Sequence, residues 1–450
     1  MEAWVVAVLA AGGTAVGIHV FGIRSGAGQA TAWALTAAIG ILCLVRRTPR
    51  KIPVLNYHSV SEAPGWMRIA GRVSLPPALF ERQLRYLKRK GYQTLFISEV
   101  RTMLAGETPV PPGKAVALTF DDGYADNWVA AYPLLRRHGA KATLFVSPDW
   151  IAETERRRPT LEDREAGRVR RLDWRGYLSW AELKAMREGG WVEIQPHGRS
   201  HDRVFTGPEV RGFCGPGKTN PWLMWTTEPG SRRTWWRDRG AIRRLYGHPV
   251  FRQGPALACR AYRPDPRAVG RQMAWAAGAG RTCFRRPDWE RHAKAAWEQK
   301  ASRNGAEGTC ESAAEYAQRV SRELSEARRI LSERTGAAAN ILCWPENAFS
   351  EDGEAIAGRL GFAATVSNRH DSRNAVGERP DRIMRVFVGS RAAGVECPAL
   401  DFAAFVLELK VMEGWYGLYP PLAVLHLCRK LALAVGRRWG WKRDYQSIWE

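Results

Sequence analysis

Two adjacent carboxylates, Asp121 and Asp122, follow a short apolar run over residues 116–120 and precede Gly123. Such a run is typical of a buried strand that carries acidic side chains to the mouth of an α/β fold. Neighbouring like charges raise each other's pKa, so the pair fits best where a cation neutralises one carboxylate and leaves the other as a base. A solvated Asp-Asp-Gly turn is the alternative for these residues taken alone.

Two histidines, His197 and His201, end a second apolar segment that begins at Trp191. This segment also reads as a strand that runs into a turn. One carboxylate and two imidazoles can bind zinc or a similar ion and leave a coordination position for water. Metal-dependent hydrolases use such an open site. A chance histidine pair is the alternative.

The motif Thr-Phe-Asp-Asp-Gly at residues 119–123, followed by His-x-x-x-His at 197–201, resembles the first two motifs of the polysaccharide deacetylase superfamily. This superfamily is carbohydrate esterase family 4, with its NodB homology domain. The resemblance covers residues 52–205 and 311–390. In motif order it is closest to the branch that contains the poly-N-acetylglucosamine deacetylases.

The resemblance implies a role for each motif residue. Asp122, His197 and His201 would hold a divalent metal ion, with zinc as the first choice and cobalt, nickel or iron as alternatives. Asp121 would be the general base.

The resemblance also implies a general acid. Residues 51–57 read as a strand that ends in Tyr57-His58. In the poly-N-acetylglucosamine deacetylase branch, a Tyr-His element before the aspartate motif supplies the acid, so His58 is the candidate. Elsewhere in the family the acid comes late in the domain, which makes His426 the second choice. A strand-end histidine satisfied by the core is the non-catalytic alternative for His58.

The segment Cys-Trp-Pro-Glu-Asn at 343–347 takes the place of the family's third motif. That motif usually has an arginine some residues before a Pro-Tyr pair, and the backbone N–H after the proline helps to hold the oxyanion. Pro345 matches, Glu346 replaces the tyrosine, and the arginine is missing. Because a backbone donor survives a change of side chain, the Glu346 amide stays the candidate oxyanion donor. Arg382 or Arg385 could orient the base instead, with a surface role as the alternative.

Helical and strand patterns alternate along the chain. The predicted helices cover residues 77–90, 127–138, 179–188, 311–334 and 351–360, and the predicted strands cover 93–96, 116–120, 141–146, 191–196, 341–344, 362–366 and 383–388. Alternation with functional residues at the carboxyl ends of strands predicts an α/β fold with a (β/α) barrel. The resemblance implies an irregular seven-stranded barrel, (β/α)7.

The chain is basic, with 68 Lys and Arg against 45 Asp and Glu and a formal charge of +23. This favours anionic partners such as lipid headgroups, acidic glycans or nucleic acid. Residues 203–310 hold 21 Lys and Arg, 8 Asp and Glu, and seven tryptophans. Because this stretch follows a metal ligand, we expect residues 206–310 to form an insertion over the active site. It could contact membrane or glycan, pack as a structural subdomain, or bind nucleic acid.

Two apolar runs near the N-terminus, residues 4–23 and 30–45, have about the length needed to cross a bilayer. No basic residue precedes the first run, which argues against a cleaved signal peptide. Four basic residues at positions 46–51 follow the second run, so the positive-inside rule predicts a transmembrane hairpin with the catalytic domain on the cytoplasmic face of a bacterial membrane. If only one run spans, the domain faces outward.

Residues 415–435 form a third apolar run. Pro420-Pro421 and Arg429-Lys430 interrupt it, so we expect a poor spanning helix. The basic and aromatic residues after 436 are typical of an interfacial segment, and an ordinary buried helix is the alternative. The eight cysteines are scattered without a Cys-x-x-Cys pair, which favours a reducing compartment.

The 450 residues therefore divide into five predicted parts. These are an anchor (1–50), the first part of the barrel (51–205), the Arg/Trp-rich insertion (206–310), the second part of the barrel (311–412) and a basic aromatic segment (413–450). We expect a membrane-anchored, metal-dependent deacetylase acting on an amino sugar in a polysaccharide or lipid-linked glycan. An inactive glycan- or membrane-binding member of the same fold, or a nucleic-acid-binding protein, is the alternative.

Overall fold

A computed structural model describes residues 51–66, 73–216, 222–227, 229–235, 237, 240–304 and 308–438. The predicted transmembrane hairpin over residues 1–50 and the basic aromatic residues after 438 lie outside the described residues. So do residues 217–221 and a few other positions of the predicted insertion.

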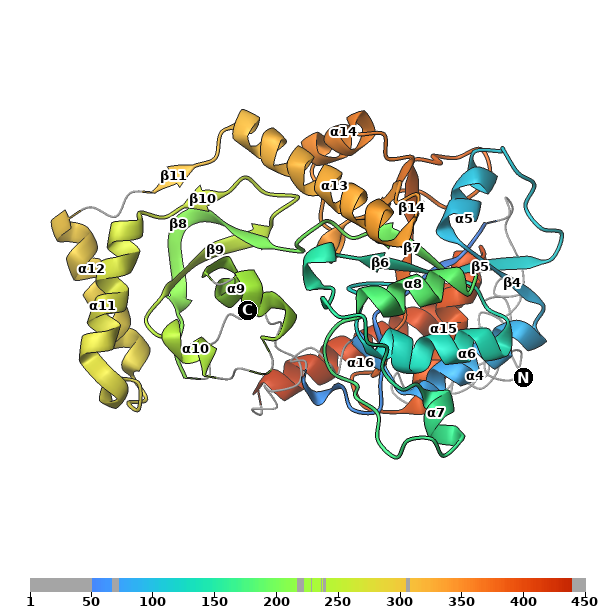
Figure 1. Cartoon of the computed structure of the whole chain (residues 1–450), viewed down its shortest axis with the longest axis horizontal. Coiled ribbons are helices and arrows are strands. Elements are labelled where there is room, and N and C mark those ends of the chain that lie inside the picture. Colours follow the sequence, from blue (N-terminus) through green and yellow to red (C-terminus); the bar gives the residue numbers. More distant parts are fainter. Residues whose placement is uncertain are drawn as a thin grey trace, which may run out of the picture.

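A parallel sheet forms the centre of the fold (Figure 1). Its strand order is β15–β1–β5–β6–β7, and β4 also pairs with β5. The strands are β1 (Val54–Tyr57), β4 (Tyr92–Leu95), β5 (Lys114–Phe120), β6 (Ala142–Val146), β7 (Val192–Pro196) and β15 (Val386–Phe387). All residues of β1 and β6 are buried, as expected for parallel strands covered on both faces.

A second parallel sheet continues the first at both of its edges. It contains β12 (Ile341–Cys343), β13 (Ala364–Ser367) and β14 (Arg382–Met384). Only Arg385 separates β14 from β15, and the backbone N–H of Ile341 donates to the side chain of Gln195 in β7 at 2.9 Å. The strands therefore follow one another in a barrel-like α/β arrangement, which confirms the predicted α/β class.

Helices pack around these strands (Figure 1). They are α4 (Pro77–Arg89), α5 (Ile97–Leu104), α6 (Tyr132–His138), α7 (Leu161–Glu165), α8 (Trp180–Glu188), α13 (Ala313–Thr335), α14 (Glu351–Arg359), α15 (Pro398–Met412) and α16 (Tyr419–Arg438). Helix α8 begins with a capping box, in which Ser179 Oγ accepts a hydrogen bond from the Glu182 N–H at 3.2 Å.

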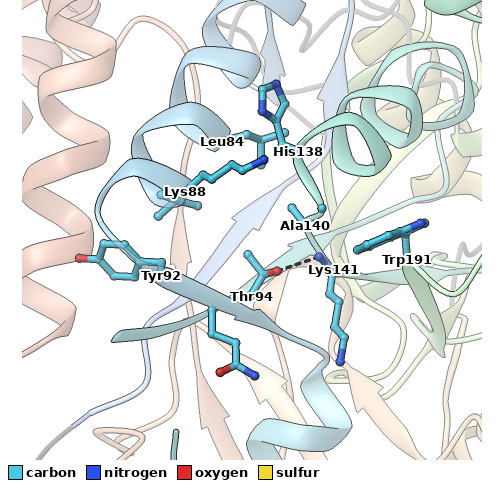
Figure 2. A pocket seen from close by; sticks show the side chains of 11 residues that line it. Leu84, Lys88, Tyr92, Thr94, His138, Ala140, Lys141 and Trp191 are labelled. Atoms are coloured by element: carbon cyan, nitrogen blue, oxygen red, sulfur yellow. Dashed lines mark hydrogen bonds between the residues drawn. The ribbon is translucent and has the colours of Figure 1, made fainter. Parts of the chain in front are cut away.

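A pocket of about 420 Å³ lies between α4, β4 and the start of β6 (Figure 2). Trp191 and Tyr92 are among its lining residues. Two of its basic side chains are already paired, Lys141 with Glu99 at 2.7 Å and His138 with Glu81 at 3.1 Å. The pocket is at the amino ends of the strands, whereas the carboxylates of the Asp-Asp-Gly motif follow the carboxyl end of β5.

Residues 203–310 form their own set of elements beside the barrel, on the side away from β4 and α5 (Figure 1). Strand β8 (Arg203–Phe213) pairs antiparallel with β9 (Pro249–Pro255), and β10 (Tyr262–Arg263) pairs with β11 (Thr309–Cys310). The helices here are α9 (Trp222–Thr227), α10 (Ala241–Arg244), α11 (Pro266–Cys283) and α12 (Trp289–Asn304).

The tryptophans of this stretch pack inside it. Six of the seven are described, and none of these six is exposed: Trp222, Trp225, Trp235, Trp275, Trp289 and Trp297. The three buried rings, Trp222, Trp225 and Trp289, cannot serve as open stacking platforms for sugars or bases. The other three are half-buried and pack against the same clusters. The described residues therefore favour the structural alternative for these tryptophans.

Helix α16 differs from the sequence-based expectation. It runs unbroken from Tyr419 to Arg438, because Pro420 and Pro421 fall in its first turn, where a missing N–H costs no helical hydrogen bond. The expected interruption at these prolines was wrong. The stretch Tyr416–Val435 is long and apolar enough to cross a membrane, with a mean hydropathy of 1.3, and only 6% of it is buried. The buried-helix alternative is therefore wrong as well.

Candidate metal centre

The turns after β5 and β7 bring Asp122, His197 and His201 together. Asp122 Oδ1 lies 3.5 Å from Nε2 of His197 and 3.5 Å from Nε2 of His201. Ligand atoms about 2.1 Å from a tetrahedral zinc ion lie about 3.4 Å from each other. The three predicted ligands therefore have the spacing of a divalent metal site. Asp122 and His201 both have left-handed backbone, with φ of 69° and 51°, which turns their side chains into this cluster.

His197 is prepared as a neutral ligand. Its Nδ1 lies 3.0 Å from the carbonyl oxygen of Cys343, and because a carbonyl can only accept, Nδ1 carries the proton. The lone pair of Nε2 is left to face Asp122. Burial lowers the pKa of His197 to about 4, so the ring is uncharged at neutral pH, as a metal ligand must be.

Asp121 is buried and held by an arginine. Arg385 Nη1 donates to Oδ1 at 2.6 Å and Nη2 donates to Oδ2 at 2.7 Å. Burial alone would raise the pKa of Asp121, but the charges of Arg385, His197 and His58 outweigh it and hold the pKa well below its usual range. Of the two arginines considered from the sequence, Arg385 therefore orients Asp121.

Arg382 has a different partner, since its Nη2 donates to Glu354 at 2.6 Å. It does not take part in the group around the paired carboxylates.

A second set of possible ligands, Asp121, His197 and Cys343, also lies close together. Both oxygens of Asp121 are engaged by Arg385, and a cation beside that guanidinium would be repelled. Burial raises the pKa of the Cys343 thiol well above its usual value, so the sulfur stays protonated and is a poor ligand. The cluster around Asp122 is therefore the better metal site.

His58 lies beside the buried carboxylate. Its Nε2 is 3.8 Å from Asp121 Oδ2, and its carbonyl oxygen accepts a hydrogen bond of 2.8 Å from Asn127 Nδ2. Its Nδ1 is buried and has no hydrogen-bond partner among the described residues. His426, the alternative acid, lies on α16 with its side chain half exposed and pairs with Glu408 at 3.0 Å.

The segment after β12 contacts the metal-binding turn. A Cβ placed on Gly198 would lie 3.5 Å from Pro345 Cγ, so the proline packs against the loop between the two histidines. Glu346 has φ of 55°, and its carboxylate forms an ion pair with Arg203 of β8. A salt bridge thus fixes the side chain of Glu346. Its backbone N–H directly follows Pro345, which packs against the candidate site.

Asn347 is a contact that the sequence did not indicate. Its Oδ1 accepts hydrogen bonds from Arg385 Nε at 3.3 Å and Nη2 at 3.1 Å. The asparagine therefore positions the arginine that positions Asp121. Arg385 is a charged residue in the middle of the predicted apolar strand 383–388, and this pattern could have indicated a buried functional role. No comparable pattern in the sequence indicated the role of Asn347.

The insertion holds the same turn from another side. Arg232 is 6% exposed and donates to both oxygens of Asp202 at 2.7 Å and to Asp149 at 3.0 Å. Asp202 follows directly after His201, and it also accepts a hydrogen bond of 3.0 Å from Trp225 Nε1. The Arg/Trp-rich stretch therefore braces the backbone next to a candidate ligand.

Glu323 of α13 supports the loop between the two histidines. Its Oε1 accepts hydrogen bonds from the N–H groups of Ser200 at 2.7 Å and Arg199 at 3.2 Å, and from Ser200 Oγ at 2.6 Å. All three donors belong to the turn that sets the separation of the imidazoles. Glu323 is thus a positioning residue for the metal site.

Replacing Glu323 with alanine should weaken zinc binding by roughly 10- to 100-fold, the usual effect of removing an outer partner of a metal site. The loop would lose the acceptor for three hydrogen bonds, so the imidazoles would no longer be held at the spacing of the site. The measurement is a competition titration against a zinc chelator. Glu326→Ala, which removes an Arg329 partner from the next turn of α13, is the control and should leave affinity unchanged. Equal affinities for both variants would refute the assigned role.

Comparison with known proteins agrees with these motifs. The family model named polysaccharide deacetylase matches residues 108–250. YxkH of Bacillus subtilis (strain 168), a protein named for the same family, is 41% identical over 98 residues, which is 22% of this chain and 32% of that protein. The poly-beta-1,6-N-acetyl-D-glucosamine N-deacetylase of Escherichia coli (strain K12) is 24% identical over 143 residues, 32% of this chain and 20% of the enzyme. The matches thus span no more than a third of these relatives.

Solved structures of deacetylases are also similar. The deacetylase domain of BpsB from Bordetella bronchiseptica has a TM-score of 0.45 and 19% identity, covering 76% of this chain and 98% of that domain. IcaB from Ammonifex degensii has a TM-score of 0.42 and 16% identity, covering 76% and 94%. The family match and the motifs coincide: residues 108–250 match the polysaccharide deacetylase family model, and Asp121, Asp122, His197 and His201 lie inside this match.

Proposed function

We propose that this chain is a metal-dependent hydrolase that removes an N-acyl group, with acetyl as the first choice, from an amino sugar in a polysaccharide or lipid-linked glycan. One observation carries the proposal. The carboxylate and two imidazoles of a metal site lie next to a separate buried carboxylate, Asp121, which has His58 at 3.8 Å. The metal ligands, a base and an acid are thus separate groups in one cluster.

Each of these groups has a distinct task. A divalent ion held by Asp122, His197 and His201 would polarise the amide carbonyl and make water acidic, with zinc as the first choice and cobalt, nickel or iron as alternatives. Asp121 accepts the proton of the attacking water, and Arg385 keeps this carboxylate ionised and aligned.

The remaining groups serve the leaving side of the reaction. His58 donates a proton to the amine nitrogen as the C–N bond breaks, which leaves a free amino sugar and a carboxylate product. The backbone N–H of Glu346 donates to the oxyanion that forms on the amide oxygen. The ion pair between Glu346 and Arg203 keeps this segment in place.

The direct test is acetate release from an oligomer of β-1,6-linked N-acetylglucosamine. We expect release that a chelator abolishes and that Zn²⁺ or Co²⁺ restores. If the protein binds the oligomer but releases no acetate with any of these metals, the chain is a glycan-binding member without turnover, and the proposal is wrong.

Replacing His58 with glutamine should lower kcat by roughly 10² to 10⁴, the usual contribution of a positioned general acid. Glutamine has a similar size but cannot supply the proton, so zinc content and substrate binding should be unchanged. Steady-state kinetics at saturating zinc are the measurement. His426→Gln is the matched control and should retain full activity. If His426→Gln loses activity and His58→Gln retains it, His426 of α16 is the general acid.

The surroundings of this domain are part of the same proposal. Residues 51–205 and 311–412 would form an irregular seven-stranded barrel, residues 206–310 an insertion at the active-site mouth, and residues 1–50 a membrane anchor. The strand order supports the barrel, and the contacts of Arg232 with Asp202 support the insertion at the active-site mouth. The apolar runs 4–23 and 30–45 support the membrane anchor. If both runs span the membrane, the domain is cytoplasmic and its substrate is a lipid-linked sugar. If only one run spans, the domain faces outward and its substrate is a surface polysaccharide or peptidoglycan. A topology reporter fused after Glu450 distinguishes the two.

A further inference from the structure

Helix α16 presents an apolar stripe to the outside of the molecule. Among the described residues, nine large hydrophobic side chains are exposed, and six of these lie between Tyr416 and Val435. Val424, Leu427, Leu431 and Val435 are each 52–58% exposed and follow one another at intervals of three and four residues. This spacing puts them on one face of the helix.

The opposite side of α16 is already occupied. Leu422 is 2% exposed and packs with Leu407 of α15 and with Leu418, while Leu425 lies against the same cluster. His426 also pairs with Glu408 of α15 at 3.0 Å. The helix is thus attached to the barrel along its inner side. Contiguous apolar surface on its outer side marks an interaction site rather than an unfinished core.

The start of α16 lies where the predicted anchor meets the described fold. The ammonium group of Lys51, the first described residue, contacts the hydroxyl of Tyr416 and lies 4.7 Å from the centre of its ring. The 50 residues before Lys51 contain the two apolar runs. Only residues 46–50 separate Lys51 from the second run, so a membrane that holds this run would pass close to Tyr416 and to the first turn of α16.

The charges along this segment favour an anionic surface. The sequence from Gly414 to Arg438 contains no Asp or Glu, whereas Arg429, Lys430, Arg437 and Arg438 supply positive charge. Lys430 is exposed and immediately precedes Leu431 of the stripe. Apolar residues on one face with basic residues at its border are typical of helices that lie in the headgroup region of anionic bilayers.

We propose that α16 lies in the surface of an anionic lipid bilayer, with Val424, Leu427, Leu431 and Val435 among the acyl chains. The helix does not cross the membrane, because its inner side stays packed on α15. This contact fixes one side of the barrel against the membrane, in addition to whatever anchor precedes Lys51. It goes beyond the proposed chemistry and does not depend on it.

Photo-crosslinking of the full chain tests the occupant of the stripe. The chain is placed in nanodiscs of phosphatidylcholine with phosphatidylglycerol, with benzoylphenylalanine in place of Leu431 or, as a control, in place of Ser325. Ser325 is exposed on α13, which lies on the other side of the central strands from α16 (Figure 1). After irradiation, mass spectrometry should find about tenfold more lipid adducts at position 431 than at 325. Nanodiscs without phosphatidylglycerol should give fewer adducts at 431.

Other occupants would give different products. Cross-links from position 431 to residues 4–45 of the same chain would show that the chain's own apolar runs cover the stripe. Cross-links to a second copy would show a dimer interface. Either result, or equal lipid adducts at positions 431 and 325, overturns the proposal. Unchanged acetate release from a soluble oligomer would confirm that the substituted protein is folded, and the adduct ratio stands whether or not the protein is a deacetylase.

Discussion

Replacing Asp122 with asparagine should give a folded protein that no longer retains zinc and no longer releases acetate. The amide oxygen of asparagine is neutral and a weaker ligand than a carboxylate, and the two imidazoles 3.5 Å away would have to hold the ion without it. Removing an outer partner of a metal site costs about 10- to 100-fold in affinity, so losing a ligand should cost more than about 100-fold. The measurement is the zinc content per chain after dialysis, by mass spectrometry of the metal.

The matched control is Asp121→Asn, which should keep its zinc. The two aspartates are neighbours in the chain, but Asp121 is bound by Arg385 on both oxygens. If Asp121→Asn loses zinc and Asp122→Asn keeps it, the ion is bound instead by the group that includes Cys343, and the assignment of roles within the Asp-Asp pair is reversed.

The same Asp121→Asn variant should lose turnover by roughly 10³, because the amide cannot accept the proton of the attacking water. It should also be less stable, because Arg385 is 1% exposed and would be left with a neutral partner. Breaking a buried ion pair typically costs about 3–5 kcal/mol, and the lower end is expected here because asparagine can still accept one hydrogen bond. The measurements are kcat at saturating zinc and the free energy of unfolding in urea.

The pH dependence of this stability loss has a defined sign. The folded pKa of Asp121 is depressed below the ordinary value of 3.8, so the ion pair contributes fully above about pH 4 and is lost only as the pH falls through the folded pKa. The difference in unfolding free energy between wild type and Asp121→Asn should therefore be constant from pH 5 to 8. Asp381→Asn, which removes an exposed partner of Arg379, is the control and should change the free energy of unfolding by less than about 1 kcal/mol.

The turnover of Asp121→Asn tests its catalytic role separately. If this variant turns over at the wild-type rate, another residue is the general base.

The sequence alone determined which residues could bind a metal and on which kind of element they lie. The paired aspartates are adjacent, the histidines are four residues apart, and both motifs end apolar strands, so their placement depends on local geometry that a short stretch already specifies. The same holds for the capping box at Ser179 and for the alternation that gives an α/β fold. These features could be predicted because neighbours in the chain decide them.

The tertiary structure decided what surrounds these residues. Asp121 and Arg385 are 264 positions apart, and they meet because β15 pairs with β1 and β1 pairs with β5, which brings the residue before β15 within side-chain reach of the residue after β5. Glu323 and Asn347 reach the site in the same way, from a helix and a turn far along the chain.

The same dependence explains why the sequence left some alternatives open. Whether a tryptophan is an open platform or a packed side chain, and whether the apolar run after 415 is inside or outside, depends on what lies opposite each face. A local pattern specifies the face of an element, but only the order and register of the strands and helices specify its partner.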